Sequence, residues 1–439
     1  PGPITGGMVH PYLRRRNGEE EVVYPHPSLE PVLKKTLGVP LFQEQVIRLA
    51  MVAADYTPGE ADQLRRDMAA WRKTGRIERH RERLVRRMEA KGIEREFAER
   101  VFDQIRGFGE YGFPESHAAS FSLIAYATAW MRRHHLDVFT CSLLNAQPMG
   151  FYSSSTIVED AKRHGLTVLP VDVTRSAWDC TLEGGEIGTA TIFRPSGRKM
   201  VAVPISPLPM RMGLRYVKGL REDVGKRVVA SRPYASIPDL VSRAGLDEGS
   251  VSRLAEAGAL RSLEPNRRGA LWAAKGAART GRGAMEVPVE ETALPEFAAL
   301  DAFETIGWDY RTSGHSAEGH PLEPLRERLR AHRLPDAAQV TAGADGSRAR
   351  YAGLVICRQR PGTASGVVFL TLEDETGFVN VVCWAPVYER FRILVKTASF
   401  LGVTGKLQRQ DGVVHLIADS FWEPRNLLAP ATAKSRDFH

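Results

Sequence analysis

A glycine-rich stretch that runs into an uncharged helix is the part of this sequence best suited to binding an anion. Residues 107–122 read Gly-Phe-Gly-Glu-Tyr-Gly-Phe-Pro-Glu-Ser-His-Ala-Ala-Ser-Phe-Ser. Glycine lets the backbone approach a ligand closely, and Pro114 and Ser116 are typical of a helix start. The N–H groups and the dipole of a helix N-terminus both favour negative charge. The sequence therefore predicts an anion site here, and a structural turn before a core helix is the alternative.

The helix that follows is expected to lie inside the protein. Residues 117–131 contain no Lys, Arg, Asp or Glu. A helix that is uncharged all round is normally buried. It ends in Arg132-Arg-His-His135, where the dipole of a helix C-terminus favours positive charge.

Two rows of basic residues are predicted on an earlier helix. Thr57-Pro-Gly-Glu60 has the pattern of a capping box with proline at the first helical position. At about 100° per residue, Arg65 and Arg72 share one line along that helix, and Arg66 and Lys73 share the next. Such rows can grip phosphates, and a solvated face with salt bridges is the alternative.

Bulk composition narrows the classes of protein. A chain of 439 residues predicts about two to four domains, and 60 Lys and Arg against 52 Asp and Glu favour a polyanionic partner. The four scattered cysteines exclude a disulfide framework and a zinc ribbon, which favours a cytoplasmic protein. No segment reaches the ~18 apolar residues of a membrane span. There is no signal peptide, and the start at Pro1 suggests a piece of a longer protein.

The order of predicted helices, strands and connectors along the chain indicates a multidomain α+β fold. The predicted segments are a mostly helical domain (1–175), a connector with short strands (176–212), a domain of tandem hairpins (213–275), a partly helical connector (276–345), a β-barrel (346–425) and a disordered tail (426–439).

Short helices separated by glycine, from Leu214 onward, resemble tandem helix-hairpin-helix units. In such units the hairpin N–H groups contact the DNA backbone without reading bases. Lys218, Gly219 and Arg221 are the candidate DNA contacts. Arg221 stands where a second hairpin glycine is usual, which puts the geometry of the first hairpin in question. An ordinary helical bundle is the alternative.

Five strand candidates with turn signals between them predict an OB-fold, a small barrel that often binds single strands. The strand candidates are 351–357, 367–372, 379–384, 400–404 and 413–418. Arg358, Arg360 and Arg409 are the candidate DNA contacts of this barrel. Phe369 and Trp384 are candidates for stacking on bases. A β-sandwich or a purely structural barrel is the alternative.

Several motifs are similar to the fingers of the bacterial DNA polymerase III alpha subunit. They are Leu41–Val46, Gly59–Arg66, Phe108–His117 and Leu169–Asp172. The order of hairpins followed by an OB-like barrel also resembles that family. Pro114-Glu115, where the replicative pattern has Asn-Lys, and Phe121, where it has tyrosine, resemble the error-prone, damage-response branch. So does the terminal sequence Ser435–His439.

The resemblance implies roles and partners. Nucleotide-binding candidates are Arg65, Arg66, Lys73, Gly112, Ser116 and His117. These residues would surround the triphosphate of an incoming dNTP, where positive charge stabilises phosphoryl transfer. The implied partners are primer–template DNA, accessory mutagenesis proteins and, through them, the sliding clamp.

Catalysis in this family implies Mg²⁺ held by an Asp-x-Asp pair and a further aspartate in the palm. No Asp-x-Asp occurs in the sequence, so we assign it no catalytic residue and no metal ligand. The acidic run Glu373–Glu375 is expected to be a solvated turn. We therefore expect the chain to bind DNA and not to extend a primer by itself. The competing hypothesis is a non-catalytic DNA- or RNA-binding protein, and a nuclease is disfavoured because no His/Asp cluster has ligand spacing.

Overall fold

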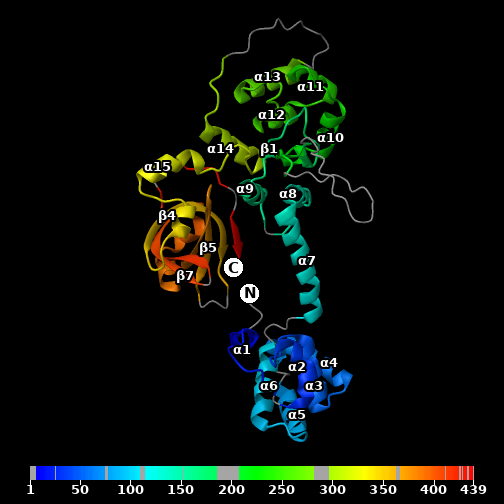
Figure 1. Ribbon diagram of the computed structural model, residues 1–439. Helices are drawn as coiled ribbons and strands as arrows, with labels where there is room; N and C mark the ends of the chain where they lie inside the picture. The colour runs from blue at the N-terminus through cyan, green and yellow to red at the C-terminus, as the bar shows by residue number, and fades with distance from the viewer. Residues whose placement is uncertain are drawn as a thin grey trace, which may run out of the picture. The chain divides into compact units, whose positions relative to one another are not determined.

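The protein folds into two compact units, Pro1–Ala129 and Trp130–His439, in a computed structural model (Figure 1). The structure describes residues 6–24, 26–74, 78–108, 114–150, 152–184, 207–280, 296–361, 366–410, 412–424, 427, 429–432 and 435–438. It describes the backbone alone at 6–10, 68–74, 78–79, 104–108, 280, 436 and 438.

The first unit is a set of helices packed around one hydrophobic core. Its elements are α1 (Gly6–Arg16), η1 (Pro27–Leu29), α2 (Glu30–Leu33), η2 (Lys34–Thr36), α3 (Gln43–Ala54), α4 (Pro58–Thr74), α5 (Glu78–Glu89), α6 (Arg95–Phe108) and the first part of α7 (Glu115–His134). The side chains of Leu29, Leu49, Leu64, Leu84 and Phe102 are almost completely buried. Because they come from η1 and from α3 to α6, this core holds all of these elements together.

Side chains fix the turns that enter α3 and α4. Oε1 of Gln45 accepts the N–H groups of Leu41 at 3.0 Å and of Phe42 at 3.1 Å. The capping box predicted at α4 is confirmed. The N–H of Thr57 donates to the Glu60 carboxylate at 2.9 Å, and the N–H of Glu60 donates to the Thr57 hydroxyl at 3.3 Å. The capping box fixes where α4 begins, and the helical repeat then determines on which side of the helix each basic residue lies.

Helix α7 begins directly after Pro114, as the sequence predicts. The prediction that it is buried on most sides is wrong, because none of its residues is buried. Leu123 and Tyr126 are 75% and 74% exposed. The absence of charge indicates a helix that packs against protein, but its side chains lie at the surface of the structure. Among these residues, no helix combines the length and apolar character needed to cross a bilayer.

Most of the helical part of the second unit, from Leu136 to Ala278, shares one hydrophobic core, whereas the helices after residue 320 pack in two other clusters that include barrel residues. The elements of this helical part are α8 (Leu136–Asn145), α9 (Ser154–Arg163), β1 (Val168–Leu169), β2 (Thr181–Leu182), β3 (Met210–Arg211), η3 (Leu214–Tyr216), α10 (Glu222–Ala230), α11 (Ile237–Ala244), α12 (Glu248–Glu256), α13 (Arg267–Thr280), α14 (Ala302–Ser313), η4 (Glu323–Leu325), α15 (Arg326–Ala331) and α16 (Ala337–Ala342). The three short strands form a small sheet in the order β1-β3-β2.

This core contains residues from both sides of the predicted boundary at residue 175. Leu144 on α8 and Val158 on α9 are buried in the same cluster as Leu254 on α12. The two compact units of the structure meet after Ala129, and α8 and α9 pack with the hairpin helices. The domain bound near residue 175 stays a prediction. Residues 185–206 of the predicted connector lie outside the described part of the chain.

The predicted OB-like barrel is confirmed. Its elements are β4 (Arg348–Gln359), β5 (Val368–Asp374), β6 (Gly377–Cys383), α17 (Ala385–Arg390), α18 (Arg392–Thr397), β7 (Phe400–Gln410) and β8 (Val413–Trp422). The strand order is β5-β6-β8-β7-β4, and β5 pairs again with β4 to close the barrel (Figure 1). Register shifts at Val355/Cys357 and at Thr404/Gly405 bend the long strands around it.

The tail predicted to be disordered contains a strand. Strand β9 (Arg436–Phe438) pairs in parallel with β4 at Cys357–Gln359. The composition of the tail gives no sign of it, because the pairing depends on a free strand edge in a distant part of the sequence.

The acidic turn of the barrel is buried, which corrects the expectation that it is solvated. The Glu373 carboxylate pairs with Arg163 of α9 at 2.9 Å. Asp374 pairs with Arg326 of α15 at 3.0 Å and accepts the N–H of Ala337 at 2.8 Å. The acidic run is therefore the place where α9, α15 and α16 meet the barrel.

The buried Glu373 makes stability depend on pH. Burial raises its pKa to about 7 from an ordinary 4.5, in spite of the opposing effect of Arg163. The folded chain therefore binds the proton of Glu373 more tightly than the unfolded chain does. This proton's contribution to the free energy of unfolding is complete below about pH 4.5 and is lost as the pH rises towards 7. This loss of unfolding free energy is at most on the order of 3 kcal/mol.

We predict that the thermal midpoint falls between pH 5 and 7.5 more steeply in the wild type than in Glu373→Gln, because only the wild type can release this proton. Glu327→Gln, on an exposed residue of α15, should follow the wild type, and parallel curves for wild type and Glu373→Gln would contradict the assignment.

Candidate nucleotide and DNA contacts

Two arginines of α4 share one carboxylate. Nη2 of Arg65 lies 2.9 Å from Oδ1 of Asp62, and Nη2 of Arg66 lies 2.7 Å from its Oδ2. The hydrogen bond from Arg65, followed by the charge of Arg66, lowers the pKa of Asp62. All three side chains are exposed, so water screens the pairs and a stronger anion can displace the carboxylate.

The N-terminus of α7 already holds an anion from this chain. The N–H of Glu115 donates to the carboxylate of Glu44, on α3, at 2.8 Å. Lys35 lies 3.5 Å from the Glu115 carboxylate. Ser116 and His117 are exposed on the first turn. A helix N-terminus that attracts negative charge is therefore present where the sequence predicts it, and Glu44 uses one of its N–H groups.

The predicted nucleotide pocket divides into two described parts. The arginine pair of α4 is organised around Asp62, and the start of α7 is organised around Glu44. Gly112 and the side chain of Lys73 lie outside the described residues. The pocket that would unite these groups stays a prediction.

The first hairpin joins η3 to α10 and turns at Gly219, whose φ is +76°. The backbone N–H groups of Gly219 and Arg221 have no acceptor within the described residues. The Arg221 side chain is 77% exposed and pairs with Asp223 at 3.0 Å. The arginine in place of the second glycine is thus compatible with an open hairpin that presents two N–H groups and a guanidinium.

Lys218 faces the other way. Its Nζ donates to the carbonyls of Tyr310 at 2.8 Å and Arg311 at 3.0 Å, at the end of α14. Burial lowers its pKa. Lys218 therefore caps α14 through these two carbonyls, while the residue as a whole stays exposed.

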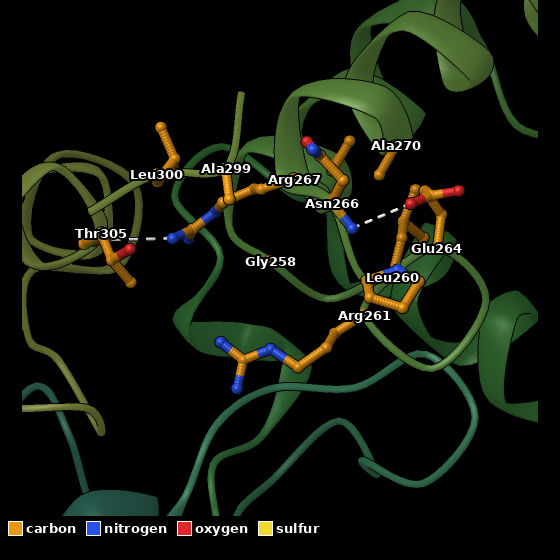
Figure 2. Close-up of a pocket in the computed structure, with 12 residues that line it drawn as sticks. Gly258, Leu260, Arg261, Glu264, Asn266, Arg267, Ala270, Ala299, Leu300 and Thr305 are labelled. Atoms are coloured by element: carbon orange, nitrogen blue, oxygen red, sulfur yellow. Dashed lines mark hydrogen bonds between the residues drawn. The ribbon is translucent and has the colours of Figure 1, made fainter. Parts of the chain in front are cut away.

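The chain turns again after α12. The φ angle of Gly258 is +72°, and its N–H donates to the carbonyl of Ala255 at 3.0 Å. Figure 2 shows the adjoining pocket, in which Arg267 reaches across toward Thr305. Arg267 pairs with Asp309 at 2.7 Å. Its volume of about 110 Å³ is below the roughly 300–1,000 Å³ that is typical of small-molecule sites.

The three predicted barrel arginines differ in exposure. Arg358 is buried and donates to the carbonyl of Val395 at 2.7 Å. Arg409 is exposed, and its guanidinium donates to the carbonyl of Thr341 at 2.8 Å. Arg360 is exposed and lies 4.7 Å from the ring centroid of Tyr388. Of the three, Arg360 has the charge most directly open to a ligand.

The two aromatic candidates of the barrel lie at its surface. Trp384 is 53% exposed and Phe369 is 37% exposed. Each ring has a free area on which a base could stack.

Comparisons with known proteins assign the parts of the chain. The family model of the bacterial DNA polymerase III alpha subunit finger domain matches residues 1–92. A helix-hairpin-helix motif matches residues 165–270, and an OB-fold nucleic acid binding domain matches residues 351–424.

Curated relatives align with the entire chain. The error-prone DNA polymerase of Pseudomonas paraeruginosa is 48% identical over 443 residues, that of Xanthomonas axonopodis pv. citri is 48% identical over 447, and that of Methylococcus capsulatus is 45% identical over 449. The chain belongs to the error-prone branch of the bacterial DNA polymerase III alpha-subunit family. It spans 41%, 40% and 42% of the lengths of these three relatives.

Sequence reasoning missed a buried polar network in the fingers of this polymerase family member. Oδ2 of Asp67, which lies on α4 like Arg65 and Arg66, is 3.0 Å from Nε2 of His80. Nδ1 of His80 lies 3.4 Å from the hydroxyl of Tyr56. Burial raises the pKa of Tyr56 to about 12. The network ties α4 to α5 and thus holds the arginine helix in place. No periodic pattern in the sequence indicates this network, because its members lie on α4, on α5 and in the turn between α3 and α4.

The geometry at Gly219 predicts a specific cost of substitution. A Cβ added there would lie 2.9 Å from Nε of Arg253, in a left-handed conformation that disfavours side chains. We predict that Gly219→Ala lowers the free energy of unfolding by about 1–2 kcal/mol. Gly276→Ala, on α13 where an added Cβ meets nothing, should be neutral or stabilising. Urea unfolding of both variants measures this, and equal effects would refute a strained hairpin.

Proposed function

We propose that this chain is the part of an error-prone DNA polymerase that binds primer–template DNA and the incoming nucleotide, while the palm of the intact enzyme performs the chemistry. The observation that carries the proposal is the first hairpin, which presents two backbone N–H groups and the Arg221 guanidinium to solvent. Such donors suit a DNA phosphate and carry no sequence preference. That property is what a polymerase requires of a DNA contact.

The barrel supports the same proposal. Exposed Trp384 and Phe369 offer stacking surfaces, and Arg360 adds positive charge. These groups suit a single-stranded template ahead of the primer. Arg358 and Arg409 hold the barrel and its neighbouring helix together, so we assign them a supporting role.

Mg²⁺ in this enzyme family belongs to the palm. Within the described ranges, no group of three or more His, Cys, Asp or Glu residues is arranged to hold a metal ion. The acidic run of the barrel is paired with Arg163 and Arg326. We therefore assign no chemical step to the residues that the structure describes.

For the nucleotide, the proposal rests on α4. Arg65 and Arg66 place two positive charges side by side, held by a carboxylate that water already screens. A triphosphate carries more charge than Asp62 and can accept bidentate hydrogen bonds from both arginines. The exposed Ser116 and His117 would complete the pocket in the intact enzyme.

The exposed helix α7 bears on the remaining partners. Phe121, Leu123, Ile124 and Tyr126 are all more than half exposed. We propose that the palm covers them in the intact polymerase. Accessory mutagenesis proteins and, through them, the sliding clamp remain proposed partners, as does a cytoplasmic location. The alternative of a separate non-catalytic DNA- or RNA-binding protein is less well supported, because error-prone polymerases align with the chain from end to end.

Salt dependence of DNA binding tests the hairpin. We predict that Arg221→Ala weakens binding to primed DNA about 3–10-fold and reduces the slope of log K against log salt by about 1. Lys218→Ala should leave that slope unchanged and lower the thermal midpoint, because its ammonium caps α14. Arg330→Ala, on an exposed site of α15, controls for loss of one charge. If Arg221→Ala and Arg330→Ala have the same slope, the hairpin is not the contact.

Removal of Asp62 tests the nucleotide site. Asp62→Ala frees both guanidiniums, so we predict that the chain binds a fluorescent dNTP about 3–10-fold more tightly, in line with the strength of charge-assisted hydrogen bonds. Glu96→Ala makes the same charge change beside Arg100 on α6 and should have no effect. Titrations at constant ionic strength compare the two variants. Equal gains would show a general effect of net charge and would remove Arg65 and Arg66 from the site.

A further inference from the structure

One edge of the barrel is completed by the end of the chain. Strand β4 pairs with β7 over Arg348–Leu354, and from Leu354 to Gln359 it pairs with β5. On its other edge, the N–H of Val355 still donates to the carbonyl of Ser399 at 2.8 Å, and beyond Val355 no residue of β7 pairs with β4. Strand β9 fills this edge by pairing in parallel with Cys357–Gln359. An open strand edge is a template for any extended peptide, and here the C-terminal tail takes that place.

A single buried arginine holds the tail at this edge. The Arg358 side chain is 10% exposed. It donates to the α18 carbonyls of Val395, at 2.7 Å, and Ala398. Its Nη1 donates to the hydroxyl of Ser435 and to the Asp437 carboxylate, the latter at 3.3 Å. Ser435 in turn donates to Asp437 at 3.0 Å, so the hydroxyl and the carboxylate form one acceptor for the guanidinium.

The charge of Arg358 explains why the ligand must be acidic. Its partners outside the tail, Val395 and Ala398, offer neutral carbonyls. Among the described residues, the carboxylate paired with it is that of Asp437. A cation removed from water needs a counter-ion, and this counter-ion is supplied by the tail. The edge is therefore complementary to a strand with a hydroxyl at one position and a carboxylate two residues later.

We propose that this edge of β4 is a receptor groove for an extended Ser-x-Asp peptide. The tail of the chain is its resident ligand, and the same segment supplied by another molecule can replace it. Backbone pairing over three residues gives a short contact that can be exchanged, while Arg358 provides specificity. The proposal concerns protein recognition and does not depend on the DNA-binding role.

The resident ligand is tested in the full chain. Asp437→Asn keeps the shape of the side chain and removes its charge. We expect carboxypeptidase to release the last residues from this variant at least ten times faster than from the wild type, as followed by mass spectrometry. Asp419→Asn, which disrupts an exposed pair with Arg348 on the same barrel, should be digested at the wild-type rate. Equal rates for Asp437→Asn and wild type would overturn the proposal.

The receptor groove is tested with a labelled peptide of residues 432–439. The Asp437→Asn chain, with its own tail weakened, should bind it at least tenfold more tightly than the wild type, whose tail competes. A peptide that itself carries Asp437→Asn should bind the same chain at least tenfold more weakly. Because only the peptide changes in this last comparison, folding of the protein cannot account for the difference. No binding to the Asp437→Asn chain, or equal binding of the two peptides, would overturn exchange in trans.

Discussion

The buried ion pairs at the acidic turn of the barrel are the interaction on which the second unit depends. Glu373 and Asp374 are 5% and 0% exposed, and each is paired with an arginine from a different helix, Arg163 and Arg326. Breaking a buried pair by removing one partner costs about 3–5 kcal/mol, because the other charge is left without compensation. The barrel therefore cannot turn away from α9 and α15 without exposing unpaired charges. The raised pKa of Glu373 shows that burial outweighs the attraction even in the intact pair.

The same requirement for compensation decides which basic residues are available to DNA. Arg358 and Lys218 each satisfy carbonyls or carboxylates of their own chain. Arg221 and Arg360 keep their charge at the surface. The net charge of +8 thus does not locate a DNA-binding surface, because basic side chains also form hydrogen bonds and ion pairs within the protein. Exposure and partner identity separate the two uses, and a sequence contains neither.

Local signals in the sequence predicted local structure well. The capping box at Thr57, the helix start after Pro114 and the five barrel strands all depend on neighbouring residues, and all are present. Features that depend on distant partners were missed. The boundary after Ala129 arises because α8 and α9 pack on hairpin helices, and strand β9 arises because β4 has a free edge. For the candidate site, the sequence located the twin arginines and the helix start. It could not show that Asp62 and Glu44 already occupy them.

Helix α7 shows how a correct physical signal can give a wrong expectation. Its lack of charge predicted burial, yet none of its residues is buried. The helix is nevertheless suited to burial. The hydroxyl of Ser122 donates to the carbonyl of Ala118 at 2.8 Å, and that of Thr128 donates to the carbonyl of Ile124 at 2.8 Å. These polar groups are satisfied within the helix, so covering them leaves no hydrogen bond unmade. The uncharged sequence thus indicates that burying α7 would be favourable, and the proposed palm is the partner that would bury it.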